Sequence, residues 1–252
     1  MTKKIIAVDL DGTLLNGESK LSDFTKDTIK QISKKGHHVI IATGRPYRMA
    51  KDFYHQLELE TPMINFNGSL THLPGKVWEH EKCLTVDKKY LLDMVARKEE
   101  IEADFIAGEY RKKFYITAPD HEIADPRLFG VENFHPENQF NSDLVTKDPN
   151  CILLQTRASD KYALAEEMNK FYQYQLNINT WGGPLNILEC TPKGVHKAFA
   201  LEYLLKVMNR DKQDLIAFGD EHNDTEMLSF AGKGYAMKNA NPALLSFADD
   251  QL

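Results

Sequence analysis

The chain has 252 residues, of which 42% are hydrophobic and 27% are charged, and its formal net charge is −6. This composition predicts a soluble globular protein with one large or two moderate domains, and it gives no general attraction to nucleic acid or to an anionic membrane. Because no apolar run could span a bilayer and the N-terminal residues lack the apolar centre of a signal peptide, we expect a cytoplasmic protein without a membrane or nucleic-acid partner.

The first third of the sequence alternates strand patterns with helix patterns. Three compact apolar runs predict buried parallel strands, at residues 4–8, 39–42 and 63–66. Ser22 is placed to cap a helix that stops at Gly36, and Pro46 suits the first turn of a second helix. The order strand, helix, strand, helix, strand is typical of a doubly wound α/β fold.

The pattern changes near residue 84 and later returns. Predicted helices at residues 86–100 and 160–174 are separated by strands and by a stretch rich in Pro, Asp and Asn. From residue 194 onward, helix and strand patterns alternate again. We therefore predict a doubly wound, mainly parallel α/β core made of residues 1–83 and 187–252, with an α+β cap domain, residues 84–186, inserted into it.

Aspartate residues follow two of the predicted buried strands. Asp9 and Asp11 come after the first strand, and Asp220 follows the strand at residues 215–218. Open α/β sheets bind ligands at the carboxyl ends of their strands, and Mg²⁺ takes oxygen ligands from carboxylates, water and phosphate. An Asp-x-Asp-Gly segment alone is more often a capped turn. The third carboxylate favours a bound cation, because three acidic groups brought together without one would repel each other.

Two further segments are candidates for binding an anion. Thr43, Gly44 and Arg45 stand between a predicted strand and a helix, where a hydroxyl group and backbone N–H groups can hold a phosphate, although a single Thr there is also an ordinary helix cap. Lys197 lies in the first turn of a helix, where the dipole disfavours a cation. A buried anion would compensate for this, and the alternative is a solvated surface lysine. The cysteines and three of the histidines lack the spacing of a metal site, namely Cys83, Cys151, Cys190, His37, His38 and His222.

The order of these motifs resembles the haloacid dehalogenase superfamily, and within it the Cof-type phosphatases of sugar phosphates and related compounds. The matching strings are residues 9–15 (DLDGTLL), 41–45 (IATGR), 67–68 (NG), 194–197 (GVHK), 219–227 (GDEHNDTEM) and 236–240 (AMKNA). The likeness spans almost the whole chain. It implies a Mg²⁺-dependent phosphatase with a Rossmann-like core and an inserted cap.

The resemblance also implies a role for each motif. Asp9 would be the nucleophile that accepts the phosphoryl group, and Asp11 the general acid that protonates the leaving oxygen and later activates water. Mg²⁺ would be held by Asp9, the backbone carbonyl of Asp11, and Asp220, with the support of Asp224. The phosphate would be bound by the backbone amide of Leu10 and by Thr43, Gly44, Arg45, Lys197 and Asn223. Covalent catalysis by a carboxylate splits the reaction into two displacements, which agrees with these assignments.

Two alternatives use the same core. A phosphomutase would have to protect the phosphoenzyme from water, and a degenerate phosphate-binding regulatory protein would be expected to lose the nucleophile or a metal ligand. The substrate is expected to be a small phosphorylated metabolite, chosen by cap residues around Phe114, Tyr115, Trp181 and Asn186. Its identity and the oligomeric state are left open by the sequence.

Two departures from the family pattern lead to further expectations. Lys193 lies four residues before Lys197 and could compete for its role, although the register to Gly194 and Val195 favours Lys197. The chain stops at Leu252, where relatives usually continue through another strand and helix. We therefore expect an apolar sheet edge beside the strand that begins at Gly234.

Overall fold

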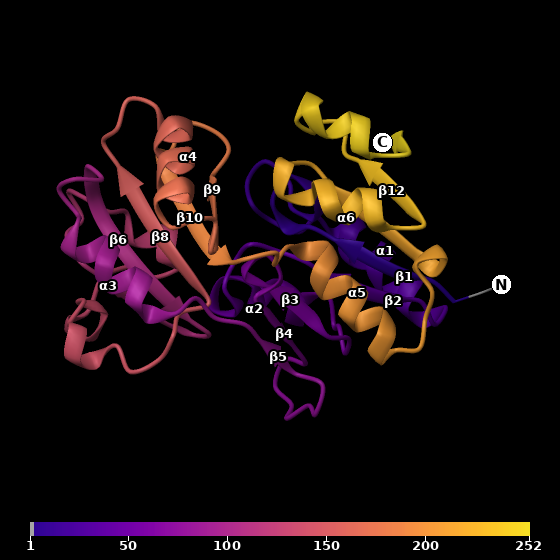
Figure 1. Ribbon diagram of the computed structural model, residues 1–252. Helices are drawn as coiled ribbons and strands as arrows, with labels where there is room; N and C mark the ends of the chain where they lie inside the picture. The colour runs from indigo at the N-terminus through magenta and orange to yellow at the C-terminus, as the bar shows by residue number, and fades with distance from the viewer. Residues whose placement is uncertain (1–2) are drawn as a thin grey trace. The chain divides into compact units, whose positions relative to one another are not determined.

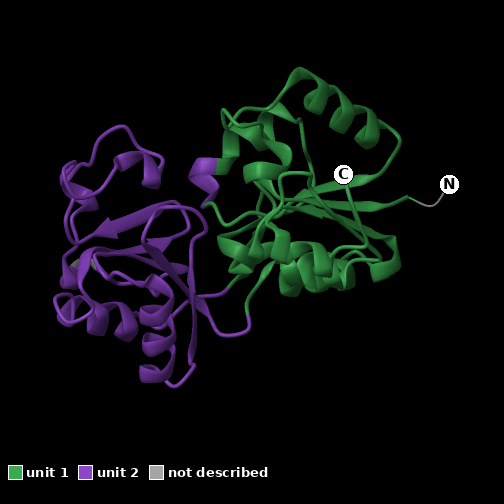
Figure 2. Cartoon of the chain, turned by 90° about the horizontal axis from the view of Figure 1, so that it is seen from above, with its two compact units in different colours: residues 1–45, 50–83, 195–252 green, residues 46–49, 84–194 purple. Residues whose placement is uncertain are grey.

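A computed structural model describes residues 3–252, so the first two residues of the predicted core segment lie outside the described residues. The chain forms two compact units (Figure 2). Unit 1 contains Met1–Arg45, Ala50–Cys83 and Val195–Leu252, and unit 2 contains Pro46–Met49 and Leu84–Gly194.

The centre of unit 1 is a parallel sheet that includes the strands labelled β1, β2 and β12 in Figure 1. Its strand order is β13-β12-β11-β1-β2. Its strands are β1 (Ile5–Val8), β2 (His38–Ile41), β11 (Leu215–Gly219), β12 (Lys233–Ala236) and β13 (Asp250–Gln251). Strand β1 lies between β11 and β2, where Ile5 is opposite both His38 and Leu215. All of its residues are buried, as predicted for a parallel strand that is covered on both faces.

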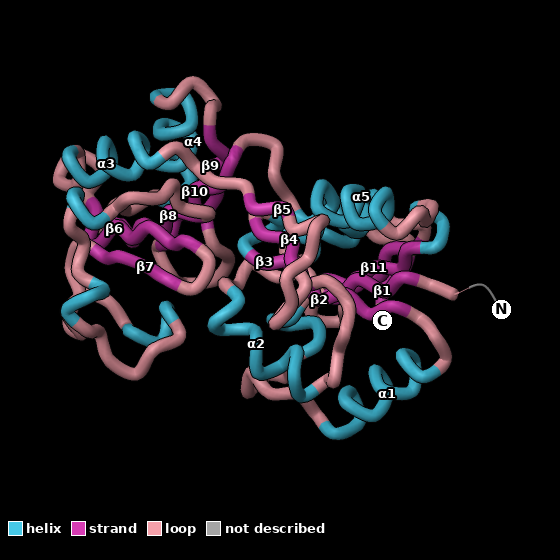
Figure 3. Tube along the Cα trace, turned by 90° about the horizontal axis from the view of Figure 1, so that it is seen from below, coloured by secondary structure: helices cyan, strands magenta, loops and turns pink. Residues whose placement is uncertain are grey.

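Helices cover both faces of this sheet. Helices α5 (Lys197–Val207) and α6 (Thr225–Phe230) pack against the face that carries Ile5 and Ala7, and α1 (Asp23–Lys34) lies on the opposite face (Figure 3). As predicted, the Ser22 hydroxyl caps α1 by accepting a hydrogen bond from the Thr25 N–H at 3.0 Å. Helix α2 (Tyr47–Gln56) follows β2, and β3 (Met63–Asn65), β4 (Leu70–His72) and β5 (Lys82–Cys83) form a small antiparallel sheet.

Unit 2 is built on an antiparallel sheet with the strand order β7-β6-β8-β10-β9. The strands are β6 (Ala103–Tyr110), β7 (Lys113–Ile116), β8 (Cys151–Thr156), β9 (Leu176–Thr180) and β10 (Ile187–Pro192). Helices α3 (Lys88–Ala96) and α4 (Lys161–Phe171) cover one face, where Met94 and Met168 pack against Ile106, Ile152 and Leu154. The apolar residues that alternate along these strands therefore form a second hydrophobic core.

The division between the units differs from the predicted boundary after residue 186. Strand β10 pairs with β8 and β9, so unit 2 extends through Gly194. The apolar pattern of β10 is as suitable for a core strand as for a cap strand, and only its pairing decides between them.

The expected bare edge beside β12 is covered. Strand β13 pairs with Tyr235 and Ala236, and Leu244 is buried in the core of unit 1. Across residues 3–252, no helix has both the length and the apolar character needed to cross a bilayer.

Candidate active site

The pairing of parallel strands brings the sequence motifs to one edge of the sheet. Asp9 follows β1, Asp220 follows β11, and Thr43 follows the end of β2 by two residues. Val8 is in register with both Phe218 and Ile41, and the Asp9 N–H donates to the Phe218 carbonyl at 3.1 Å. The three segments therefore leave the sheet side by side, as the strand-end argument predicted.

Three carboxylates form a compact cluster at this edge. Asp9, Asp220 and Asp224 each offer an oxygen atom, and these atoms lie within 4.8 Å of one another. Asp9 and Asp224 are buried. Asp224 is held in place because it accepts hydrogen bonds from the backbone N–H groups of Asp220 and Glu221 at 3.0 and 3.3 Å. The four-residue spacing in this loop thus returns the Asp224 carboxylate to the end of β11.

Burial disfavours the charged forms of these carboxylates. Desolvation raises the pKa of Asp9 to about 7, an effect that Lys197 opposes and the nearby Asp224 and Asp11 charges reinforce. Desolvation likewise raises the pKa of Asp220 to about 6. A small, buried set of oxygen donors with excess negative charge suits a hard divalent cation such as Mg²⁺. The residues present therefore fit the metal that the family resemblance implies.

Lys197 is fully buried against the cluster, not solvated. Its ammonium group donates to Asp9 Oδ1 at 2.6 Å and to Asp224 Oδ1 at 2.7 Å. Burial alone lowers its pKa, but the ion pairs with Asp224 and Asp9 dominate and raise the pKa above its ordinary value. Lys193, in contrast, is exposed and belongs to unit 2. The structure therefore brings Lys197 to the carboxylates and leaves Lys193 in solvent.

Asp11 does not join the carboxylate cluster. Its side chain is half-exposed and forms a two-pronged ion pair with the Arg45 guanidinium, in which Arg45 Nε donates to Asp11 Oδ2 at 2.7 Å. The Arg45 guanidinium also lies 5.5 Å from the centre of the Phe53 ring. A side chain that the sequence analysis assigned to phosphate binding is thus engaged with the predicted general acid.

The predicted anion-binding segment is fixed by backbone hydrogen bonds. The Thr43 N–H donates to the Ile64 carbonyl at 3.0 Å, and the Asn67 N–H donates to the Thr43 carbonyl at 3.1 Å. The Thr43 hydroxyl accepts from the Arg45 N–H at 3.1 Å, which is a local turn contact two residues along the chain and not a helix cap, since α2 begins only at Tyr47. Gly44 faces the Asn67 side chain, where an added Cβ would lie 3.2 Å from Asn67 Nδ2.

The remaining predicted residues lie around the same edge. Leu10 is buried in the turn after β1, and Asn223 donates from Nδ2 to Asn67 Oδ1 at 3.1 Å. Sequence reasoning did not single out Thr13, which donates to Asp220 Oδ1 at 2.8 Å, or Asn239, which donates to the Gly12 carbonyl at 2.9 Å. Their only signal was their position inside the matching strings.

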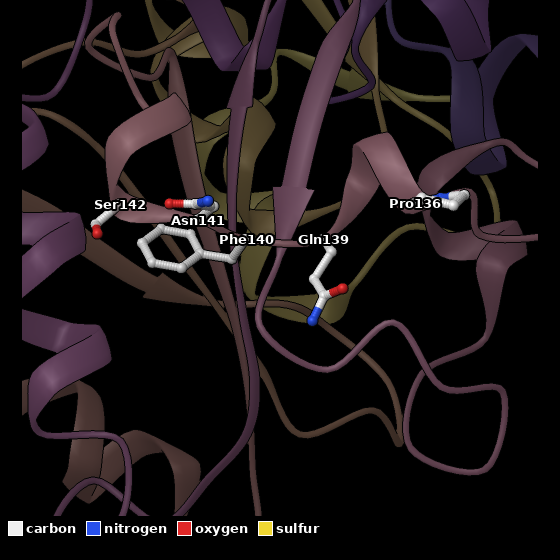
Figure 4. Close-up of a pocket in the computed structure, with 5 residues that line it drawn as sticks. All are labelled: Pro136, Gln139, Phe140, Asn141 and Ser142. Atoms are coloured by element: carbon white, nitrogen blue, oxygen red, sulfur yellow. The ribbon is translucent and has the colours of Figure 1, made fainter.

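A shallow surface pocket lies in unit 2 (Figure 4). It is lined by Pro136, Gln139, Phe140, Asn141 and Ser142. None of the clustered carboxylates lines this pocket.

Comparisons with known proteins identify the family of this chain. The family described as haloacid dehalogenase-like hydrolase matches residues 6–252. The 5-amino-6-(5-phospho-D-ribitylamino)uracil phosphatase YitU of Bacillus subtilis is 32% identical over 251 residues, which are 97% of this chain and 90% of that protein. Phosphatase YwpJ of the same organism is 27% identical over 271 residues, covering 98% of this chain and 93% of that protein. A solved haloacid dehalogenase-like hydrolase from B. subtilis is 26% identical, with a TM-score of 0.80, and the match covers 98% of this chain and 94% of that chain.

A doubly wound core with clustered carboxylates at the carboxyl edge of its sheet, together with a second α+β unit, defines the class as an α/β enzyme. The chain belongs to the haloacid dehalogenase-like hydrolase family. The predicted family, fold class and enzymatic nature are confirmed.

Proposed function

We propose that this protein is a Mg²⁺-dependent phosphatase that hydrolyses small phosphorylated metabolites through an aspartyl-phosphate on Asp9. One observation carries the proposal: a buried carboxylate at the end of β1 is paired with a buried lysine at 2.6 Å and lies beside two further carboxylates. This arrangement combines a nucleophile, a fixed positive charge and the ligands for a divalent cation.

Asp9, Asp220 and Asp224 are the residues that would hold the metal, together with the backbone carbonyl of Asp11. When bound, Mg²⁺ would neutralise part of the negative charge that otherwise repels a phosphate group from these carboxylates. Lys197 would add a second positive charge. Its contacts with Asp9 and Asp224 hold the ammonium group beside the proposed nucleophile, where it would offset the negative charge of the phosphoryl oxygens.

In the first step Asp9 would attack phosphorus, forming its bond to the phosphoryl group as the bond to the leaving oxygen breaks. Asp11 would donate the proton that the leaving oxygen needs. In the second step Asp11 would take a proton from water, which attacks the aspartyl-phosphate and releases inorganic phosphate. To reach the leaving group, Asp11 would have to break its ion pair with Arg45, and its half-exposed side chain leaves room for this movement. Arg45 would then be free to contact the phosphate.

The remaining predicted phosphate contacts are the Thr43 hydroxyl, the Gly44 and Leu10 backbone amides and the Asn223 side chain. Unit 2 occupies the position in the chain that the cap was predicted to take, with residues through Gly194 instead of 186, and we propose that it selects the substrate. The name of the relative YitU makes 5-amino-6-(5-phospho-D-ribitylamino)uracil a specific candidate to test among the sugar-phosphate class.

The alternatives are less well supported. A degenerate binding protein would not be expected to keep Asp9, Asp11, Asp220 and Lys197 together, and no feature of the described residues favours a phosphomutase.

The decisive experiment is phosphate release from a panel of sugar phosphates, nucleotides, cofactor phosphates and the ribitylaminouracil phosphate, with Mg²⁺ and with excess chelator. The proposal expects turnover of at least one compound with Mg²⁺ and none with chelator or after Asp9→Asn. Phosphate transfer between two sugar positions without release would favour the phosphomutase.

A further inference from the structure

The turn at residues 66–68, between β3 and β4, forms backbone hydrogen bonds to both ends of the predicted anion-binding segment at residues 43–45. The Asn67 N–H donates to the Thr43 carbonyl at 3.1 Å, and the Phe66 N–H donates to the Arg45 carbonyl at 3.4 Å. Asn67 also accepts a hydrogen bond from Asn223 at 3.1 Å. The turn therefore joins two of the segments that carry predicted phosphate ligands.

The same turn closely approaches the start of the helix that carries Lys197. A Cβ atom added to Gly68 would lie 2.6 Å from the backbone oxygen of His196, the residue before Lys197. Only glycine allows this separation between the two backbones. The turn thus contacts the anion-binding segment and the Asn223 side chain, and it lies close to the N-terminus of α5.

The turn has a backbone conformation that the sequence alone would not favour. Phe66, Asn67 and Gly68 have consecutive positive φ angles of 50°, 52° and 113°. A bulky residue such as phenylalanine rarely adopts the left-handed region, and such conformations persist where surrounding contacts impose them. Contacts from outside the turn must therefore hold it in place.

A buried side-chain pair supplies such contacts. Asn65 is fully buried and donates from Nδ2 to the Arg45 carbonyl at 2.8 Å, while its Oδ1 lies 2.9 Å from His72 Nε2. A carbonyl can only accept a hydrogen bond, so the amide nitrogen must face Arg45 and the amide oxygen must face His72. His72 must then carry a proton on Nε2. The two residues are diagonal neighbours on one face of the β3-β4 hairpin, because Asn65 is opposite Leu70 and His72 is opposite Met63.

We infer that Asn65 and His72 are positioning residues for the anion-binding segment: His72 orients the Asn65 amide, and Asn65 fixes the Arg45 carbonyl and with it the Thr43 hydroxyl and Gly44 N–H. The inference rests on the proposed function only in taking residues 43–45 as the phosphate-binding segment. Neither residue would touch the substrate. Their effect would be on phosphate affinity, through the alignment of the donors.

The test uses the full-length protein with Mg²⁺ and measures the binding of inorganic phosphate by calorimetry, which needs no turnover. Asn65→Asp replaces the donor with a second acceptor facing the Arg45 carbonyl, and His72→Phe removes the donor to Asn65 with little change of shape. Each should weaken phosphate binding by about tenfold or more, the effect of one misplaced hydrogen-bond partner. His72→Gln keeps an N–H donor and should recover phosphate binding to within about threefold of the wild type.

Asn150→Asp is the matched control. Asn150 is also fully buried and donates from Nδ2 to a backbone carbonyl, that of Leu84, at 2.7 Å, but it lies in unit 2. It should lower the melting temperature and leave phosphate affinity unchanged. A structural role alone would make His72→Phe and Asn150→Asp alike, with lower melting temperatures and unchanged phosphate affinity, and this result would overturn the inference.

Failure of the inference can be distinguished from failure of the proposed function. If the wild type binds phosphate and the variants behave as expected, but no phosphomonoester is hydrolysed, the proposed function fails and the positioning role stands. If phosphatase activity is found while His72→Phe and Asn65→Asp bind phosphate as the wild type does, the positioning role fails alone. A wild type that binds no phosphate in the presence of Mg²⁺ would also overturn the positioning role.

Discussion

Replacement of Lys197 by methionine tests the central electrostatic argument. The ammonium group is wholly buried and forms two short ion pairs, with Asp9 and with Asp224. Breaking a buried pair by removing one partner destabilises a protein by about 3–5 kcal/mol, because a charge is left buried without compensation. Loss of one preorganised charge facing the phosphate should separately lower kcat by about 100- to 1000-fold.

The two effects can be separated by measuring them under different conditions. The free energy of unfolding is measured in urea with excess chelator, and kcat with saturating Mg²⁺. Lys193→Met is the matched control, since this lysine is exposed and a surface substitution usually changes stability by less than about 0.5 kcal/mol. Without Lys197 the pKa of Asp9 should rise further, so the destabilisation should be smaller at pH 5, where Asp9 is protonated, than at pH 8.

Equal behaviour of the Lys197 and Lys193 variants would refute this reasoning. A Lys197→Met protein that keeps more than about a tenth of the wild-type kcat would also refute it, because loss of a preorganised charge that stabilises the transition state lowers kcat by more than this. A large loss of kcat without any loss of stability in chelator would mean that the lysine contacts phosphate but does not compensate the buried carboxylates.

Three further predictions concern the same edge of the sheet. The pKa values of Asp9 and Asp220 are raised in the folded state, so the contribution of these two groups to the stability of the metal-free protein should be complete below about pH 4 and lost as the pH rises through 6 to 7. Mg²⁺ should reverse this loss, and a melting temperature in chelator that does not fall between about pH 5 and pH 7 would contradict the argument. Gly12→Ala should raise the Mg²⁺ concentration for half-maximal activity by about tenfold or more, because the φ angle of Gly12 is +77° and the new Cβ would lie 2.0 Å from Asp220 Oδ2. Gly17→Ala is the control, since Gly17 has open space around it and the Mg²⁺ requirement should not change. Similar Mg²⁺ requirements for the two variants would count against the placement of Asp220. Asp11→Asn should give a burst of about one equivalent of product with an activated aryl phosphate and none with an alkyl phosphate in rapid quench, and equal loss for both would remove Asp11 as the acid and base.

The clustered carboxylates Asp9 and Asp220 could be placed from the sequence because each follows its own strand. Apolar runs before Asp9 and Asp220 predicted buried parallel strands, and parallel strands align their carboxyl ends at one edge. The structure has this alignment, with Val8 opposite Phe218. No tertiary information beyond the strand order was needed to expect the two carboxylates near each other.

The environment of the two basic residues depended on tertiary contacts. Lysine is mostly exposed in proteins, and nothing in the helix pattern around Lys197 distinguishes a solvated from a buried ammonium group. Arg45 was expected to meet a phosphate, but in the structure it binds Asp11, because the loops after β1 and β2 leave the same edge together. The cap boundary depended in the same way on pairing: an apolar strand such as β10 could join either sheet.

The contact between the positioning residues Asn65 and His72 also depends on tertiary structure and could not be predicted from the sequence. Asn65 and His72 are seven residues apart, a spacing that matches neither a helix face nor a metal motif, and each alone has the pattern of an ordinary strand residue. They meet only because β3 and β4 pair in a register that makes them diagonal neighbours. A one-residue slip of that register would turn His72 to the other face of the hairpin and remove its hydrogen bond to the Asn65 amide oxygen. The contact that holds the Arg45 carbonyl therefore depends on the pairing of a small hairpin that carries none of the proposed catalytic groups. Motif matching could not detect it for this reason, and substitutions there should alter phosphate affinity without touching the ligand.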